Sequence, residues 1–183
     1  MLDCFDGGLA SWSISTSPDA ELANSSLARA CATLSPGEAP WVHSDRGGHY
    51  RWPGWIAICE EHGLTRSMSA KGCSPDNSAC EGFFGRLKSE FFHCRDWGGV
   101  TAEEFMASLD AWLRYYNEER PKEALGWMSP MEYRRSLGLA PKDGGPGLQD
   151  FCRTPKSRSF VELCYRFRRG FSIERRGARV HSS

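Results

Sequence analysis

Residues 78–92 read Ser-Ala-Cys-Glu-Gly-Phe-Phe-Gly-Arg-Leu-Lys-Ser-Glu-Phe-Phe, and this stretch predicts a long helix with two different faces. One side gathers apolar residues at helical spacing, namely Phe83, Phe84, Leu87 and Phe91. Glu81 and Lys88 are seven residues apart. An α-helix returns such a pair to nearly the same face, separated by about 10 Å along its axis. We therefore expect one face to pack and the other to present an acid and a base together.

A second stretch, residues 41–48, reads Trp-Val-His-Ser-Asp-Arg-Gly-Gly and predicts a short strand that ends at Asp45. Thirty-five residues separate Asp45 from Glu81. Carboxylates at a strand end and in a first helical turn suit hard divalent cations, because Mg²⁺ prefers oxygen ligands. Two such ions about 3.5–4 Å apart polarise an attacking hydroxyl and stabilise a leaving oxygen at a phosphate. The chemistry indicated is phosphoryl transfer on DNA.

Ordinary structural roles compete with this interpretation. Asp45 precedes Arg-Gly-Gly and has the composition of a turn. Glu81 fits a capping box that begins at Ser78, and Lys88 fits a solvated surface lysine. Gly82 and Gly85 each lower helix stability by roughly 1 kcal/mol, which is consistent with close approach of another backbone.

The remaining pattern predicts an α/β protein with a mixed sheet. Strands are expected at residues 2–5, 8–16, 41–44 and 64–69, and helices at residues 17–34, 53–61, 78–92, 101–118 and 129–137. The strand at 8–16 rests on serines that alternate with Ala10, Trp12 and Ile14.

The zero net charge hides an asymmetry between two parts of the chain. Residues 1–140 hold 13 Lys and Arg against 19 Asp and Glu, and residues 141–183 hold 10 against 4. An acidic body argues against nucleic-acid binding unless specific residues provide it. Residues 141–183 are expected to form a basic and largely disordered tail, in which the apolar run 160–167 is the one place that could fold.

The eight cysteines contain no Cys-x-x-Cys pair and are expected to be reduced thiols. A zinc site from Cys73, Cys80, His93 and Cys94 would need an unusual ligand spacing. The chain has no apolar run long enough for a membrane span and no basic leader, so a cytoplasmic location is expected.

Several blocks of sequence closely resemble the integrase core of insertion-sequence-3 type transposases. They are His43 to Tyr50, Ser74 to Glu90, Tyr116 to Lys122 and Leu125 to Arg134. The resemblance covers about residues 1–140 and implies that they form a partial integrase catalytic core, whereas residues 141–183 have no counterpart in the family.

The resemblance implies a ribonuclease-H-like mixed sheet flanked by helices, with two Mg²⁺ or Mn²⁺ ions. It implies that Asp45 is the second catalytic aspartate and Glu81 the catalytic glutamate, both as metal ligands. Lys88 matches the basic residue that grips terminal DNA, and Lys71 and Asn77 fall where DNA contacts are expected. The implied partners are DNA, as transposon ends and target, and other subunits, as a homo-oligomer or full-length transposase.

The family's opening strand carries the first catalytic aspartate, and it lies upstream of the segment that matches Leu2 to Phe5. Asp3 resembles an aspartate of the second strand, so a strand-end or turn role is expected for it. We therefore expect a core that lacks the first strand and is inactive alone. The alternatives are a non-catalytic DNA-binding or regulatory module, and a structural protein without a nucleic-acid role.

Overall fold

The computed structural model describes residues 1–17, 19–44, 47–68, 78–139 and 159–161. Its four strands are β1 (Leu2–Asp3), β2 (Trp41–Ser44), β3 (Thr65–Met68) and β4 (Ser159–Val161). They form one mixed sheet in the order β1-β4-β2-β3. β4 is antiparallel to β1 and parallel to β2, and β2 is parallel to β3. β4 lies inside the range 141–183, of which the structure describes only these three residues.

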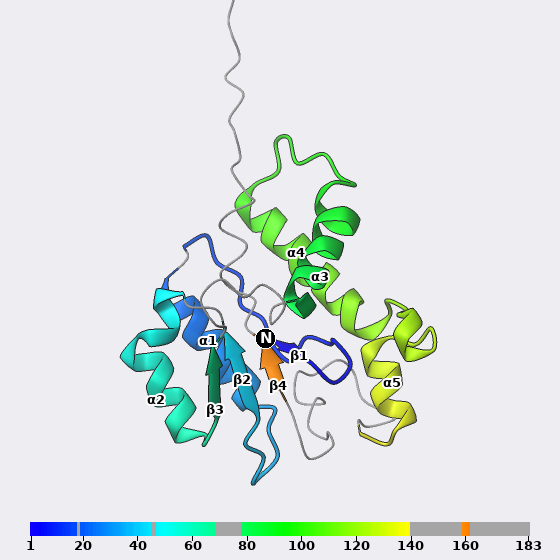
Figure 1. The fold of residues 1–183 in the computed structure, drawn as a ribbon. Helices are drawn as coiled ribbons and strands as arrows, with labels where there is room; N and C mark the ends of the chain where they lie inside the picture. The colour runs from blue at the N-terminus through cyan, green and yellow to red at the C-terminus, as the bar shows by residue number, and fades with distance from the viewer. Residues whose placement is uncertain (18, 45–46, 69–77, 140–158, 162–183) are drawn as a thin grey trace, which may run out of the picture.

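Helices surround this sheet (Figure 1). They are α1 (Ala20–Cys31), α2 (Pro53–Glu61), α3 (Ser78–Arg86), α4 (Ala102–Glu118) and α5 (Pro130–Ser136), with a π-helix at Leu87–Phe92 that continues α3. α1 and α2 contact each other near β2 and β3, whereas α3, α4 and α5 lie toward β1 (Figure 1). No helix in the described part of the chain is both long and apolar enough to cross a membrane.

Local sequence signals account for most helix boundaries. Asp19 caps α1 by accepting a hydrogen bond from the Leu22 amide at 2.9 Å. Capping boxes begin α4 and α5, where Thr101 pairs with Glu104 and Ser129 pairs with Glu132. The predicted bounds of β2 and α2 are confirmed, and β3 lies within its predicted range.

Two apolar clusters flank the sheet. One joins α1 and α2 to Met1 and Val42 and includes Leu27, Tyr50 and Trp55. The other joins α3, the π-helix and α4 to Leu2 and is mainly aromatic, with Phe83, Phe91, Trp112 and Tyr116. The buried side of α4 carries Leu109, Trp112, Leu113 and Tyr116 at helical spacing. Because Met1 and Leu2 belong to different clusters, β1 lies between the two cores.

The strand predicted at residues 8–16 is wrong apart from one isolated bridge between Leu2 and Leu9. The alternation has another cause, since the segment runs between two helices. Ser11 Oγ donates to the Ser26 carbonyl of α1 at 2.7 Å. Trp12 Nε1 donates to Asp110 of α4 at 2.7 Å. Alternate side chains therefore face α1 and α4, which produces a period of two without a sheet partner.

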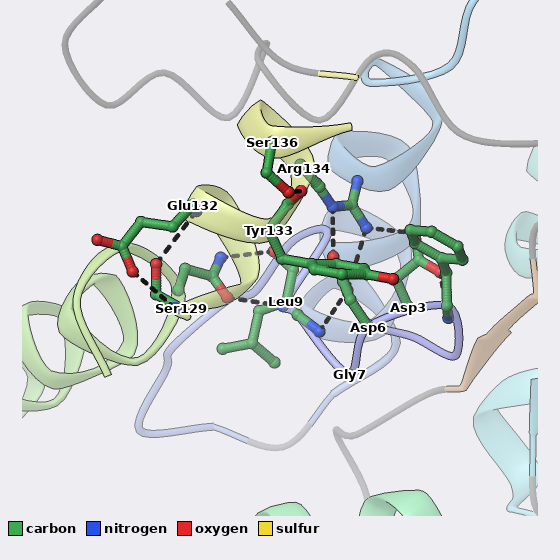
Figure 2. Close-up of polar contacts among 12 residues, drawn as sticks. Asp3, Asp6, Gly7, Leu9, Ser129, Glu132, Tyr133, Arg134 and Ser136 are labelled. Atoms are coloured by element: carbon green, nitrogen blue, oxygen red, sulfur yellow. Dashed lines mark hydrogen bonds and ion pairs between the residues drawn. The ribbon is translucent and has the colours of Figure 1, made fainter. Parts of the chain in front are cut away.

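Arg134 of α5 forms a buried ion network with Asp3 and Asp6 near the N-terminus (Figure 2). Its side chain and those of Asp3 and Asp6 are all 0% exposed. Arg134 Nε donates to Asp6 Oδ2 at 2.5 Å, and Nη2 donates to Asp3 Oδ2 at 2.9 Å. Asp3 Oδ1 also accepts from the Phe5 amide at 3.0 Å, which is the turn role expected for it. One guanidinium therefore pairs two buried carboxylates.

We predict that Arg134→Met lowers the free energy of unfolding by about 3–5 kcal/mol, because it leaves two carboxylates buried without their partner. Urea unfolding measures the loss. Arg135→Met is the matched control, since Arg135 is the next residue of α5 and only partly buried. Adding Asp3→Asn and Asp6→Asn to Arg134→Met should recover part of the stability. Equal losses for the Arg134 and Arg135 variants would contradict the assignment.

Two thiols, those of Cys31 in α1 and Cys59 in α2, belong to the same apolar core cluster. Cys31 and Cys59 are both buried, and neither they nor Cys4, Cys80 and Cys94 are disulfide-bonded, as predicted for these five. Burial raises the pKa of Cys31 to about 12, with a further contribution from Cys59. Burial also raises the pKa of Cys59 to about 11, against an opposing effect of Arg66.

These shifts predict a loss of stability at high pH. In the unfolded chain the two thiols ionise near pH 9.0, whereas in the folded chain they keep their protons to about pH 11 and 12. Their contribution is therefore complete below pH 9 and is lost as pH rises toward 11. The difference in unfolding free energy between the wild type and the Cys31→Ala, Cys59→Ala variant, measured under reducing conditions, should shrink over this range. Cys94→Ala removes an exposed thiol and is the control, for which no such change with pH is expected. If the difference between the wild type and the Cys31→Ala, Cys59→Ala variant stayed constant from pH 9 to 11, the prediction would be refuted.

Candidate active site at the start of α3

Five residues were predicted to form the site, and the structure describes two of them. Asp45, Lys71 and Asn77 lie outside the described residues. Glu81 lies in the first turn of α3 and is partly exposed, and Lys88 lies in the π-helix and is exposed. The described part of the candidate site therefore consists of α3, the π-helix and β2, the strand that precedes Asp45 in the sequence.

β2 ends at Ser44, whose side chain is buried, and Asp45 is the next residue in the sequence. β3 and β4 flank β2 and both run parallel to it, with Ser44 opposite Met68. The carboxyl ends of three neighbouring strands therefore share one edge, the edge at which ligands bind in open α/β sheets. A cross-strand contact of 3.0 Å between His43 Nδ1 and Ser67 Oγ ties β2 to β3 close to it.

α3 presents Glu81 through an ordinary amphipathic division. Cys80, Phe83 and Phe84 are buried, whereas Gly82 and Gly85 are exposed. A Cβ atom at Gly85 would meet nothing within 4 Å in the described part of the chain, and one at Gly82 would meet only Arg86 Nη1, at 3.6 Å. Within the described part of the chain, the two glycines therefore leave the surface of α3 beside Glu81 without a covering side chain other than Arg86. α3 begins on the side of the sheet toward which β2, β3 and β4 point (Figure 1).

The capping role considered for Glu81 stays a prediction, because residue 77, which precedes the first described residue of α3, lies outside the described residues. Capping boxes are present at Thr101 and Ser129, where the helix begins one residue after the hydroxyl side chain.

The predicted single helix over residues 78–92 changes character at Leu87. The π-helix there is closed by a hydrogen bond from the His93 amide to the Lys88 carbonyl, at 2.8 Å. Ser89 Oγ donates to the Gly85 carbonyl at 3.0 Å, so a side chain occupies an acceptor that an α-helix would give to a backbone amide. A π-helix turns less per residue than an α-helix. The angle around the helix axis between Glu81 and Lys88 is therefore larger than it would be after seven α-helical steps, which return almost to the same face.

An ion pair fixes the orientation of the π-helix. Arg120, just after α4, donates from Nε to Glu90 Oε2 at 2.7 Å and from Nη2 to Glu90 Oε1 at 2.5 Å. Hydrogen bonding to Arg120 lowers the pKa of Glu90 and raises the pKa of the guanidinium. The bidentate geometry holds the helix two residues from Lys88.

Two further side chains that sequence patterns did not single out anchor the N-terminal segment to the end of α4. Asn117 accepts from the Leu9 amide and donates to the Leu9 carbonyl, both at 2.8 Å. Lys122 Nζ donates to the carbonyls of Asp6 and Gly7 at 3.1 and 2.6 Å and lies 4.4 Å from the centre of the Tyr116 ring. Burial lowers the pKa of Lys122 to about 8. Their hydrogen-bond partners are more than 100 residues away, so no local pattern could have revealed these hydrogen bonds.

Among the described residues, no three His, Cys, Asp or Glu side chains gather closely enough to hold a metal ion. Cys80, His93 and Cys94 therefore do not form the partial zinc site considered above, and Cys73 lies outside the described residues.

Comparison with known proteins shows which proteins the chain is similar to. Residues 62–130 match the Integrase core domain. The chain is 58% identical over 139 residues to a probable transposase for insertion sequence element IS1353 of Shigella flexneri, across 76% of this chain and 27% of that protein. The chain is related to the transposases of IS3-type insertion sequences.

Two relatives from Escherichia coli strain K12 support the same relationship. The putative transposase InsK for IS150 is 36% identical over 134 residues, and transposase InsF for IS3fB is 34% identical over 137 residues. Each match covers 73% of this chain, and 47% and 46% of the two relatives. The chain thus spans between about a quarter and about half of these transposases.

The integrase core identifies the mixed sheet with its flanking helices as ribonuclease-H-like, as predicted. The range that matches the Integrase core domain contains both Glu81 and Lys88, together with all of α3, the π-helix and α4. It also contains both Glu90 and Arg120, so their ion pair lies wholly within the matched range, whereas Lys122 lies within it and the carbonyls that it binds lie outside.

Proposed function

We propose that the chain contributes Asp45 and Glu81 as two of the three metal-binding carboxylates of a DNA transposase core, with Lys88 holding the DNA terminus beside them. The observation that carries this proposal is the partly exposed Glu81 in the first turn of α3, within the range that matches the Integrase core domain. Asp45 is the next residue in the sequence after Ser44, at which β2 ends.

The donor set suits a hard cation, because both side chains supply carboxylate oxygens. Bound Mg²⁺ or Mn²⁺ would polarise the attacking hydroxyl and stabilise the leaving oxygen at a phosphate, in the manner of two-metal sites. Glu81 would hold the cation at the start of a helix whose uncovered glycines admit a DNA backbone. Lys88 would neutralise a neighbouring phosphate, in an orientation that the Glu90–Arg120 pair preserves.

Two carboxylates leave the metal shell incomplete in the family's arrangement, which uses a third. We therefore infer that the 183-residue chain by itself binds metal and DNA ends but does not join DNA strands. It would act in the cytoplasm on transposon ends and target DNA, together with a second copy or a full-length transposase, and without a membrane partner.

We predict that the purified chain binds Mn²⁺ and that Glu81→Gln and Asp45→Asn each weaken this binding by at least about 10–100-fold. Loss of a group that only supports a metal ligand already weakens metal binding by this factor, so loss of a ligand itself should weaken it as much or more. Electron paramagnetic resonance of unbound Mn²⁺ measures the affinity. Glu103→Gln is the matched control, because Glu103 is an exposed glutamate in the first turn of α4. Equal affinity for the wild type, Glu81→Gln and Asp45→Asn would refute the metal site.

A second prediction concerns the cation on the π-helix. Lys88→Ala should weaken binding to a blunt-ended DNA duplex for all sequences alike, and should reduce the slope of log affinity against log salt concentration by about 1, because one phosphate contact is lost. Fluorescence anisotropy at several salt concentrations measures both. Arg135→Ala, a partly exposed cation on α5, is the control. An unchanged slope for Lys88→Ala would remove this lysine from the DNA site.

The same preparation tests the inactivity of the chain. With Mn²⁺ and labelled duplex, no strand-transfer product is expected on a denaturing gel. Product that disappears in Glu81→Gln would show that the chain catalyses transfer alone.

The alternative is a non-catalytic module that binds transposon ends or full-length transposase. The observation in its favour is the net charge of +6 in residues 141–183, from 10 Lys and Arg against 4 Asp and Glu. DNA binding at low salt without Mn²⁺ binding would favour this module over the partial catalytic core.

A further inference from the structure

β4 comes from a part of the chain that is remote from the rest of the sheet. Nineteen residues, 140–158, separate Leu139 near the end of α5 from Ser159, the first residue of β4. β4 nevertheless lies inside the sheet, between β1 and β2 (Figure 1). Its position is therefore set by pairing with strands that precede it by more than 100 residues.

The three residues of β4 pair on both sides. Toward β1 the register pairs Val161 with Leu2 and Phe160 with Asp3. Toward β2 it pairs Ser159, Phe160 and Val161 with Trp41, Val42 and His43.

Within the described strands, β1 and β2 pair with β4 and not with each other. Without β4, the facing amides and carbonyls of both strands would lose their partners. Unpaired backbone groups are costly when buried, and Leu2, Asp3 and Val42 are all buried. The gap between β1 and β2 is thus a site that requires an extended segment.

The geometry of this gap is that of a strand-accepting site. An extended peptide can add to an unpaired strand edge through main-chain hydrogen bonds, which depend little on side-chain identity. This gap offers two such edges, one for parallel and one for antiparallel pairing. A segment tethered through a connection of about twenty residues competes at an effective concentration of millimolar order. The chain's own segment would therefore exclude dilute peptides while remaining exchangeable.

We propose that the gap between β1 and β2 is a binding site for an extended peptide segment, which residues 159–161 of this chain occupy in an exchangeable manner. The same segment supplied as a separate peptide takes the place of β4 when the chain's own copy is disabled. This property is independent of metal and DNA binding, because it rests on the backbone of three strands.

The test uses the full chain with Phe160→Pro, which removes a ladder amide at the middle of β4. The probe is a labelled peptide of residues 156–163. Fluorescence anisotropy should show at least tenfold tighter peptide binding by Phe160→Pro than by the wild type, because the internal competitor is weakened. Phe160→Ala keeps the amide and is the matched control. A peptide with N-methyl groups at the positions of Phe160 and Val161 should bind neither chain.

Hydrogen exchange measured by mass spectrometry decides the outcome whether or not Phe160→Pro remains folded. Residues 1–4 and 41–44 should exchange faster in this variant than in the wild type, and the unmodified peptide should restore their protection. If the substitution unfolds α4 as well, the peptide should restore the protection of residues 102–118. Unchanged exchange in both strands, or no restoration by the peptide, would overturn the proposal.

Discussion

The pairing of Arg134 with Asp3 and Asp6 is the interaction on which the rest of the structure depends. It joins α5 to the turn that follows β1, across 128 and 131 residues of sequence, with every participating side chain removed from water. Lys122 and Asn117 bind the same N-terminal segment by its backbone carbonyls and amide, and Ser11 binds it to α1. The first residues of the chain thus connect the two cores, and β1 holds its position because cations and amides from the far end of the fold fix the turn beside it.

The candidate site inherits its rigidity from these long-range contacts. The Tyr116 ring packs on Phe83 of α3 at 5.0 Å and lies beneath Lys122, while Arg120 grips Glu90 of the π-helix. The short segment that follows α4 therefore orients both the N-terminal turn and the helix that carries Glu81 and Lys88. This arrangement gives the Tyr116 to Lys122 block a structural purpose, which the resemblance alone did not provide.

The sequence revealed elements whose signals are local. The bounds of α2 followed from the residue pattern at 53–61, and α4 lies within the helix predicted at residues 101–118. It failed where a period had a different cause, as in residues 8–16, whose alternation reflects two flanking helices. It also missed the change to π-geometry at Leu87, which depends on the hydroxyl of Ser89 and on the distant clamp between Glu90 and Arg120. Glu81 could be singled out because its spacing from Lys88 and Asp45 is visible in one dimension, but the neighbours that orient it are not.

The place of β4 has a consequence for biosynthesis. Synthesis of the other described strands is complete at residue 68. Synthesis of β4, which fills the place between β1 and β2, is complete only at residue 161. During that interval a nascent chain exposes two unpaired strand edges, which are templates for association with other chains. Such a late, non-local closure also slows folding, because the entropy of a long loop must be overcome before the final pairing contributes.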